Sequence, residues 1–553
     1  MLHRKERQMM QARVDDRLRE WQQSGFARRL WSKDHTLWSP VPMPELTDRL
    51  GWLDLPETMA AELDGLTAFA AEIKAAGMHH VVLLGMGGSS LAPAVFQHTF
   101  VNAPGYPELI VLDSTHPGAV SAVDARIDPR HTLFLVSSKS GTTTETLSLF
   151  RYFWQRVGSL LAGPGEHFVA ITDPGTPLVR LAGERAFRRV FLAPADVGGR
   201  YSALTVFGLV PAALIGVDVR KVLERVRGMS AACGPSAPSH ENPGLALGAI
   251  LGEMTLGGRD KLTLLASPSL ASLPPWIEQL VAESTGKDGT GIVPVVEEPA
   301  GPPDAYGADR VFVHLRLERD ADGALDAQIG ALESAGHPVV RIALRDTADL
   351  GAEFFRWEVA TAAAGAVLAI HPFNQPDVQL AKDLAQQAMA KASASGAQPA
   401  APAAGEVSVT DPAALAGALA AWLAQVRPGD YVGLQAYLMP SAQISQWLQR
   451  IRAILRDRLR VATTAGYGPR FLHSTGQLHK GGPDGGVFLQ IVDEPADDLA
   501  VPETTYTFGA LIGAQGSGDL QALRRRSRRV LRVNLGRDAA GGLARLAHTL
   551  EER

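Results

Sequence analysis

The chain has 553 residues, of which 46% are apolar and 20% are charged. These proportions are typical of a soluble globular protein, and they exclude a fibrous, collagen-like or wholly disordered chain. Lysine and arginine number 53 and aspartate and glutamate 58, so the formal net charge is −5. A bulk electrostatic attraction to nucleic acid or to acidic membranes is therefore not expected.

The remaining global features favour a cytoplasmic protein. The single cysteine, Cys233, can form neither an intramolecular disulfide nor a cysteine-based zinc site, and a thiol in a reducing cytosol is the simplest interpretation. Residues 1–21 are charged throughout and lack the apolar core of a secretory signal. The longest apolar run, 203–217, contains Pro211 and is shorter than the roughly 18–20 residues of a membrane span. We expect no membrane and no nucleic-acid partner.

The N-terminal part and the rest of the chain have different patterns. Residues 1–50 predict a helical arm, which ends in a proline-rich stretch. From His80 onward, short apolar runs alternate with helical stretches, which indicates βαβ units and parallel sheets covered on both faces. The predicted strands are 80–86, 109–113, 132–136 and 168–172, then 262–266, 311–317, 339–344, 431–437 and 530–535.

We therefore predict an α/β fold with two tandem domains, 51–245 and 246–553, each built on a mainly parallel sheet. A long buried helix is expected over 352–370. The low-complexity segment 391–406 has too few large apolar side chains to offset the cost of ordering its backbone, so we expect a mobile surface loop. The arginine-rich stretch 524–532 favours a solvated helix face over an anion site.

Two hydroxyl-rich turns follow predicted strands. The first, GMGGSS at 85–90, fails the dinucleotide fingerprint because Ser90 stands where a third glycine is needed. It is equally compatible with an anion site at a helix N-terminus and with a simple strand-to-helix turn. The second, SSKSGTTTET at 137–146, places six hydroxyls around Gly141 within residues 137–144, which favours phosphate binding over a helix cap. Because the GK[ST] pattern is missing, a sugar phosphate is a better candidate than a nucleoside triphosphate.

Two further segments contain candidate catalytic groups. Arg200 follows two glycines in VGGRYS, where it either holds a developing oxyanion or lies in a surface turn. Gln279 and Glu283 are four apart and share one face of the helix that starts WIEQLVAESTGKDG. Glu283 is expected near the helix C-terminus, an unfavourable place for a carboxylate, which is consistent with a general base and also with a solvated glutamate.

The last two segments are IHPFNQPDVQLAKD at 370–383 and RFLHSTGQLHKGGPDGG at 470–486. The first contains Gln375 near the start of a predicted helix and Lys382 on it. The second contains His473 and His479, whose spacing of six does not suit one metal on one helix. The sequence contains no HExxH or CxxC motif, and neither a metal nor a cofactor is expected.

Together these segments resemble the phosphoglucose isomerase (glucose-6-phosphate isomerase) family. The most specific match is ESTGKDGTGIVP with Gln279, followed by SSKSGTTTET, GMGGSS, VGGRYS, HPFNQPDV and LHSTGQ, which span residues 85 to about 490. The resemblance is closest to the isomerase half of fused transaldolase–isomerase proteins, without the transaldolase half. It implies two sugar-isomerase (SIS) domains and a homodimer with shared active sites.

The resemblance also implies roles for individual residues. Glu283 corresponds to the base that moves the proton between C1 and C2, and Arg200 to the group that stabilises the cis-enediolate. His473 and Lys382 correspond to the ring-opening groups, and the family takes the histidine from the neighbouring subunit. Contacts with the sugar and its phosphate are implied for Gly88, Ser89, Ser138, Lys139, Ser140, Thr143, Gly199, Gln279 and Gln375.

Two departures from the family pattern affect these expectations. The family places the histidine segment before the lysine segment, whereas here His473 follows Lys382 by about 90 residues. The topology of the second domain and the subunit that supplies His473 are therefore open. His371 replaces an expected asparagine, and a structural role is favoured over a catalytic one.

The implied activity is interconversion of glucose 6-phosphate and fructose 6-phosphate in glycolysis and gluconeogenesis. One carboxylate base, one cation for the enediolate and ring-opening groups suffice for this reaction, without a metal. Two alternatives are a non-catalytic sugar-phosphate-binding regulator on the same fold, and an isomerase that also accepts mannose 6-phosphate.

Overall fold

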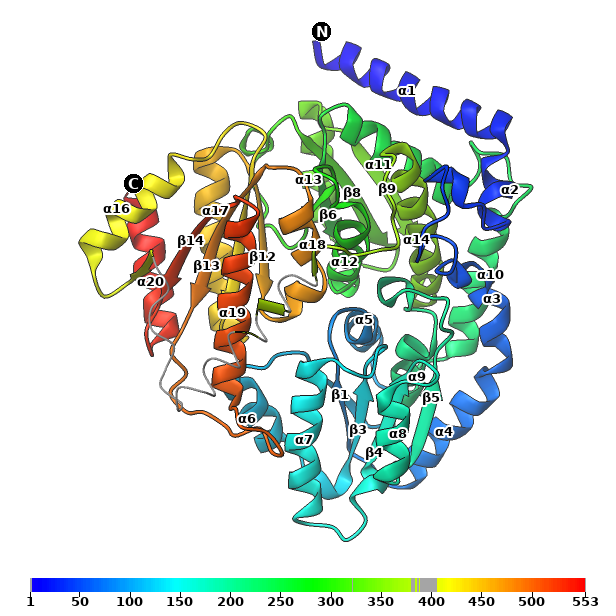
Figure 1. Cartoon of the computed structure of the whole chain (residues 1–553). Coiled ribbons are helices and arrows are strands. Elements are labelled where there is room, and N and C mark those ends of the chain that lie inside the picture. Colours follow the sequence, from blue (N-terminus) through cyan, green and yellow to red (C-terminus); the bar gives the residue numbers. More distant parts are fainter. Residues whose placement is uncertain (1, 321, 379–382, 385–386, 388–404, 553) are drawn as a thin grey trace.

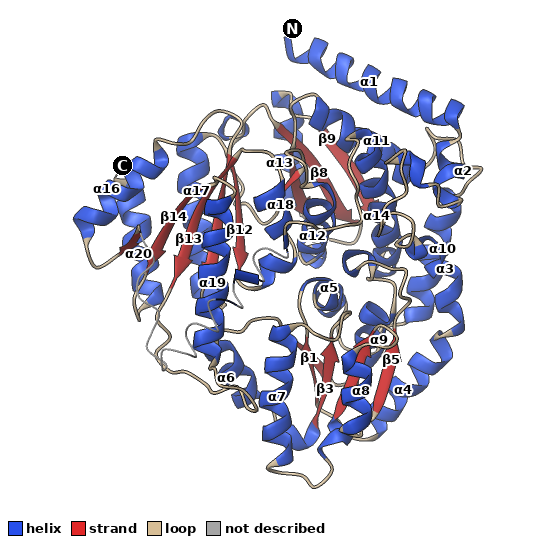
Figure 2. Cartoon of the chain, in the orientation of Figure 1, coloured by secondary structure: helices blue, strands red, loops and turns tan. Residues whose placement is uncertain are grey.

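The computed structural model describes residues 2–320, 322–378, 383–384, 387 and 405–552. It contains three parallel sheets, each flanked by helices (Figures 1 and 2). The predicted α/β class and the N-terminal helix are confirmed. Within the described ranges, no helix is long and apolar enough to cross a membrane.

The N-terminal arm consists of α1 (Leu2–Ser24) and α2 (Phe26–Trp31). The arm lies against α11 (Pro243–Leu256), where Arg17 donates to Glu253 over 2.8 Å. Trp21 and Phe26 stack with ring centroids 4.4 Å apart, and both are buried. This burial attaches the arm to the main body.

The first sheet has the strand order β2-β1-β3-β4-β5. Because the order reverses between β1 and β3, the loops that follow these two strands meet at the carboxyl edge, the usual place for a ligand crevice in such sheets. Its strands are β1 (His80–Leu84), β2 (Glu108–Leu112), β3 (Thr132–Ser137), β4 (Phe168–Thr172) and β5 (Arg189–Leu192). Its helices are α3 (Leu55–Thr58), α4 (Leu63–Ala75), α5 (Leu91–Thr99), α6 (Pro117–Arg126), α7 (Thr144–Gly158), α8 (Pro177–Glu184) and α9 (Val206–Leu214).

The second sheet has four strands in the order β7-β6-β8-β9. They are β6 (Lys261–Ala266), β7 (Val293–Val295), β8 (Arg310–Leu317) and β9 (Val339–Leu344). The neighbouring helices are α10 (Val219–Ala232), α11, α12 (Leu273–Thr285), α13 (Gly323–Ala335) and α14 (Leu350–Val367). Helix α14 is the long buried helix that the sequence predicts.

The third sheet has the order β10-β14-β13-β11-β12. Its strands are β10 (Glu406–Ser408), β11 (Tyr431–Tyr437), β12 (Ala462–Tyr467), β13 (Gly486–Val492) and β14 (Arg529–Asn534). Its helices are α16 (Pro412–Leu423), α17 (Ala442–Leu459), α18 (Gly476–Gly481), α19 (Phe508–Arg525) and α20 (Ala539–Glu551).

The expectation of a single sheet within 246–553 is wrong, because this range contains the second and third sheets. Side chains replace strand pairing where edge strands β7 and β12 approach each other. Buried Arg452 donates to the carbonyl oxygens of Val296 and Thr463 over 2.8 and 2.6 Å, and Glu298 Oε1 accepts from the Thr463 amide over 2.8 Å. These bonds satisfy edge groups that a continuous sheet would pair. Where the domains divide stays a prediction.

Two other expectations concern this C-terminal region. Residues 391–404 of the predicted mobile loop lie outside the described residues, and Glu406 already belongs to β10. Part of the arginine-rich stretch 524–532 is bound within the fold rather than solvated. Arg529 pairs with Asp430 over 2.6 Å, and Arg528 donates to the Gly482 carbonyl at the end of α18, also over 2.6 Å.

Candidate active site

Two glycine-containing loops of the first sheet lie side by side at its carboxyl edge. Loop 85–90 follows β1 and loop 137–143 follows β3. Ser137 Oγ donates to the Ser89 carbonyl oxygen over 3.2 Å. The turn at Gly199 completes the group, because any side chain at Gly88 would collide with the Gly199 carbonyl. The fold therefore brings Gly88, Ser89 and Gly199 together, and their contact with a sugar phosphate stays a prediction.

Hydroxyls of loop 137–143 bond to one another ahead of helix α7. Ser138 Oγ and Thr143 Oγ1 are 2.9 Å apart, and so are Ser140 Oγ and Thr142 Oγ1. Thr143 occupies the N-cap position of α7, yet among the described residues its side chain accepts no capping hydrogen bond. Thr143 therefore does not cap α7 with its side chain, and the N-terminal amides of α7 are groups that could bind an anion.

Lys139 provides the positive charge of this loop. Its ammonium group forms an ion pair with Asp173, the residue after β4. Burial lowers the pKa of Lys139, and burial also raises the pKa of Asp173, while the pairing opposes both shifts. The pair holds the lysine at the base of the loop while keeping part of it accessible.

Glu283 lies at the centre of the site, two residues before the end of α12. Its Oε1 is 3.1 Å from Arg200 Nη1, and its Oε2 is 3.2 Å from Gln279 Nε2. The Glu283 and Arg200 side chains are only 6% and 4% exposed. The solvated-glutamate and surface-arginine alternatives are therefore excluded by the structure.

Arg200 bonds in three directions. Its Nε donates to Ser284 Oγ over 2.7 Å, and its Nη2 donates to the carbonyl oxygens of Pro372 and Asn374 over 2.8 and 2.9 Å. The guanidinium thus joins the end of α12 to the turn 371–376. This planar fork has a fixed position, which a lysine could not reproduce.

Lys287 holds the same turn from the other side. Its Nζ donates to the carbonyl oxygens of His371 and Asn374 over 2.5 and 2.6 Å, and to Asn374 Oδ1 over 2.9 Å. Burial, followed by the nearby Arg200 charge, lowers the pKa of Lys287 well below its ordinary value. The exposed Gln375 follows Asn374 on this turn, whereas Lys382 lies outside the described residues.

His371 is bound within the fold. Its Nε2 lies 3.0 Å from the Pro44 carbonyl oxygen, and its Nδ1 accepts from the Phe373 amide over 3.1 Å. Burial lowers its pKa to about 4, so the ring is neutral at pH 7. This geometry fits the structural role that the sequence favours.

His473 reaches the site from the third sheet of the same chain. Its carbonyl oxygen accepts from Gln279 Nε2 over 2.7 Å, and its ring Nε2 is 2.9 Å from Glu145 Oε1. Gln515 Nε2 donates to the same Glu145 oxygen over 2.8 Å, and Thr115 Oγ1 donates to Gln515 Oε1 over 2.8 Å. His473 therefore has a fixed ring orientation beside the Glu283 helix.

Several residues of this site were not predicted from the sequence. They are Thr115, Glu145, Ser284, Lys287 and Gln515. The position of Glu145, in the first turn of α7 directly after the hydroxyl loop, was the available signal for one of them. His479 is not part of the site: it is buried and its Nδ1 lies 3.2 Å from Gln435 Nε2.

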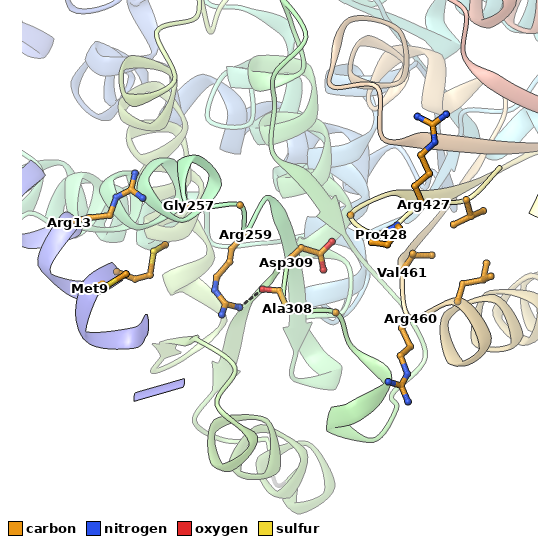
Figure 3. Close-up of a pocket in the computed structure, with 16 residues that line it drawn as sticks. Met9, Arg13, Gly257, Arg259, Ala308, Asp309, Arg427, Pro428, Arg460 and Val461 are labelled. Carbon is orange, nitrogen blue, oxygen red and sulfur yellow. Dashed lines mark hydrogen bonds between the residues drawn. The ribbon is translucent and has the colours of Figure 1, made fainter. Parts of the chain in front are cut away.

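A separate cavity of about 790 Å³ contains none of these residues. It is bordered by segments that precede β6, β8, β11 and β12, and by Met9 and Arg13 of α1 (Figure 3). Arg259 donates within the fold to the Ala308 carbonyl, while Arg427 and Arg460 point away from each other. We therefore do not assign the reaction site to this cavity.

Comparison with known proteins identifies a family and several relatives to which the chain is similar. Residues 67–304 match the family described as phosphoglucose isomerase. Glucose-6-phosphate isomerase of Rubrobacter xylanophilus is 29% identical over 396 residues, which cover 63% of this chain and 90% of that protein. The Thermus thermophilus glucose-6-phosphate isomerase is 28% identical over 388 residues, covering 62% of this chain and 90% of the relative.

Solved structures share the fold over much of the chain. Hypothetical protein TT0462 from Thermus thermophilus is 25% identical, with a TM-score of 0.60, and the match covers 69% of this chain and 98% of that one. A glucose-6-phosphate isomerase from Chlamydia trachomatis is 21% identical, with a TM-score of 0.53, covering 67% and 78%. The second likeness supports the fold alone.

Proposed function

We propose that this chain is a member of the phosphoglucose isomerase family, whose model matches residues 67–304, and that it interconverts glucose 6-phosphate and fructose 6-phosphate. The proposed reaction is metal-independent, passes through a cis-enediolate and serves glycolysis and gluconeogenesis in the cytoplasm. The likeness to the isomerase half of transaldolase–isomerase fusions stays a prediction, as does the homodimer.

The observation that carries this proposal is the buried Glu283 carboxylate between Arg200 and Gln279. In our mechanism Glu283 takes the C1 proton of the open-chain ketose, which leaves an enediolate, and returns that proton to C2. The hydroxyl proton moves between O2 and O1, so the atoms balance. When Glu283 takes the proton, its negative charge is lost and a negative charge develops on the substrate oxygens. Because Glu283 lies against Arg200, both charges are close to the same guanidinium, which can stabilise each of them in turn.

We assign the phosphate to the two loops at the carboxyl edge of the first sheet. The contributing groups are Ser89, Ser138, Lys139, Ser140 and Thr143, with the N-terminal amides of α7. Hydroxyls and free amides suit phosphate oxygens, and the helix dipole favours their negative charge. An anchored phosphate lets binding energy orient C1 and C2 against Glu283. Gly88, Gly199, Gln279 and Gln375 are proposed to contact the sugar.

We assign ring opening to His473, which Glu145 orients as a positioning residue. A ring nitrogen that is held by a carboxylate keeps one orientation toward the substrate, the arrangement expected of an acid–base histidine. Lys382 is proposed as the second ring-opening group on the basis of its motif.

The test is a coupled assay with fructose 6-phosphate in the presence of EDTA, with NADPH formed by glucose-6-phosphate dehydrogenase as the readout. We expect sustained turnover, and its near-complete loss in Glu283→Gln. A wild-type chain that binds fructose 6-phosphate but neither turns it over nor exchanges the C1 and C2 protons with solvent would favour a sugar-phosphate-binding regulator. Equal turnover of mannose 6-phosphate would indicate a broader isomerase.

A further inference from the structure

We propose that His371 is a positioning residue of the isomerase site. Its ring links the turn 371–376 to the connecting segment 38–52, which leads from α2 to α3, and so fixes the carbonyl oxygens that Arg200 and Lys287 bond. The inference deepens the proposed function and rests on it. It gives the connecting segment a part in catalysis through this one ring.

The turn supplies the hydrogen-bond acceptors for two buried cations of the site. Between them, Arg200 and Lys287 donate to the carbonyl oxygens of His371, Pro372 and Asn374 over 2.5 to 2.9 Å. Carbonyl dipoles of this kind offset positive charge that burial has removed from water. The guanidinium also lies 3.1 Å from the catalytic carboxylate. A displaced turn would therefore move the guanidinium relative to the base.

The His371 ring bonds its surroundings in one tautomer. Its Nδ1 is 3.1 Å from the Phe373 amide, which can only donate, so Nδ1 is the unprotonated nitrogen. Its Nε2 is 3.0 Å from the Pro44 carbonyl oxygen, which can only accept, so Nε2 holds the proton. Burial, with the nearby charges of Lys287 and Arg200, keeps the ring neutral by lowering its pKa to about 4. The neutral ring thus joins the turn to the connecting segment.

The connecting segment is also bound to the loop that leads to Arg200. Leu50 and Val197 form an antiparallel bridge, and the Gly51 amide donates to the Asp196 carbonyl oxygen over 3.0 Å. A side chain at Gly51 would collide with the Asp196 carboxylate, so the two backbones lie close together. The segment therefore holds the Arg200 loop through its backbone and the turn through the histidine ring.

Buried aromatic rings fill the space between the connecting segment and the site. Trp52 stacks on Tyr201 with ring centroids 5.3 Å apart, and Phe373 lies 5.5 Å from Tyr201 and 5.1 Å from Trp38. Trp38 Nε1 donates to the Ala362 carbonyl oxygen of α14 over 2.8 Å. Because all four rings are buried in a closely packed interior, the segment has a fixed position against which the turn can be held.

Two substitutions separate the two bonds of the ring. In His371→Asn the side-chain amide reaches about as far as Nδ1, so it can accept from the Phe373 amide but cannot reach Pro44. In His371→Gln the longer side chain brings an NH₂ donor about to the place of Nε2, so it can keep the Pro44 bond. We expect His371→Asn to lower kcat for fructose 6-phosphate by about tenfold with little change in KM, because the turn and its guanidinium shift together. His371→Gln should retain most of the wild-type kcat.

Trp31→Phe is the matched control. It removes one bond from a side chain of the N-terminal arm to a carbonyl oxygen, that of Cys233, away from the site. It should lower the melting temperature without changing kcat, and melting curves show whether each variant is folded. A His371→Asn chain as fast as Trp31→Phe, or a His371→Gln chain as slow as His371→Asn, would overturn the inference. An inactive wild-type chain would instead contradict the proposed function, so the two failures can be told apart.

A spectroscopic measurement tests the link in the wild-type chain. The ¹⁵N chemical shifts of histidine rings distinguish a protonated nitrogen from an unprotonated one, and the spectrum of His371→Gln identifies the His371 signals by their loss. At neutral pH we expect a protonated Nε2 and an unprotonated Nδ1. A proton on Nδ1 would break the bond with the Phe373 amide and overturn the inference, even if a substituted chain failed to fold.

Discussion

The candidate site has two sides that are built differently. The base side comprises Glu283, Arg200, Ser284, Lys287 and the turn 371–376, and the histidine side comprises His473, Glu145, Gln515 and Thr115. Contacts of the base side join residues 83 to 174 positions apart, whereas those of the histidine side join residues 328 to 400 positions apart. The base side is also more enclosed, with 4% and 6% exposure for its ion pair against 15% and 9%.

The two sides should therefore respond differently to substitution. The base side combines short motifs whose charged groups pair with one another beside the reacting carbon atoms, so a change there acts directly on those atoms. The histidine side depends on how the third sheet docks against the first, so a change there acts through orientation. The largest effects on turnover are therefore expected on the base side.

The strongest effect is expected for Glu283→Gln. The amide preserves the shape of the side chain but cannot accept the C1 proton, so kcat should fall by roughly two to four orders of magnitude. Steady-state kinetics with fructose 6-phosphate measure this change, and an unchanged melting temperature would show an intact fold. Near-normal turnover would remove Glu283 from the role of base.

Arg200→Lys should follow, with kcat lower by about 10²-fold. The lysine keeps the positive charge, but one ammonium cannot replace the fork that bonds Ser284, Glu283 and the turn carbonyls together. The measurement compares kcat with KM for fructose 6-phosphate. A change confined to KM would indicate that Arg200 only binds the substrate.

On the histidine side, Glu145→Gln should lower kcat by about tenfold, because it weakens the orientation of His473 without removing the ring. A double-mutant cycle with His473→Gln tests this interpretation. If Glu145 acts through His473, the double variant is no slower than His473→Gln alone. Additive losses would show that Glu145 has a separate function.

Lys287→Met tests whether catalysis by the base side depends on the position of the turn 371–376. Loss of the ammonium leaves carbonyl oxygens of His371 and Asn374 without their donor, which should cost about 1–3 kcal/mol of stability. We expect a moderate fall in kcat, because the same turn bonds Arg200 and bears Gln375. Thermal unfolding and kinetics measured on one preparation separate the two effects. A less stable but fully active variant would confine Lys287 to stability.

The smallest effect is expected for Glu278→Gln, on α12 near Arg470. Burial raises the pKa of Glu278 from 4.5 to about 8, although nearby Arg470 opposes the shift. Between these values the unfolded state releases a proton that the folded state keeps, so stability falls as the pH rises toward 8. The amide has no such proton. The variant should therefore gain melting temperature at pH 8 relative to wild type and gain little at pH 5. An equal difference at both pH values would contradict this linkage.

The sequence alone determined the α/β class. Parallel strands that are buried on both faces require continuous apolar runs such as 132–136, and such a run can be recognised from its composition alone. It also determined the hydroxyl loop at 137–146 and the position of Glu283 near a helix end. These properties depend on neighbouring residues. Five strands were not predicted: β5, β7, β10, β12 and β13. β5, β7 and β10 have only three or four residues, and β7 contains Pro294. β12 and β13 have six and seven residues, so their length does not explain why they were missed.

Only the tertiary structure decided that the C-terminal half holds two sheets and that His473 meets Glu145 within one chain. The first depends on Arg452 and Glu298, whose bonds with the edges of β7 and β12 replace strand pairing. The second depends on docking between residues 328 positions apart. Neither leaves a local pattern, because such contacts form only after separate sheets have folded and buried their shared surface.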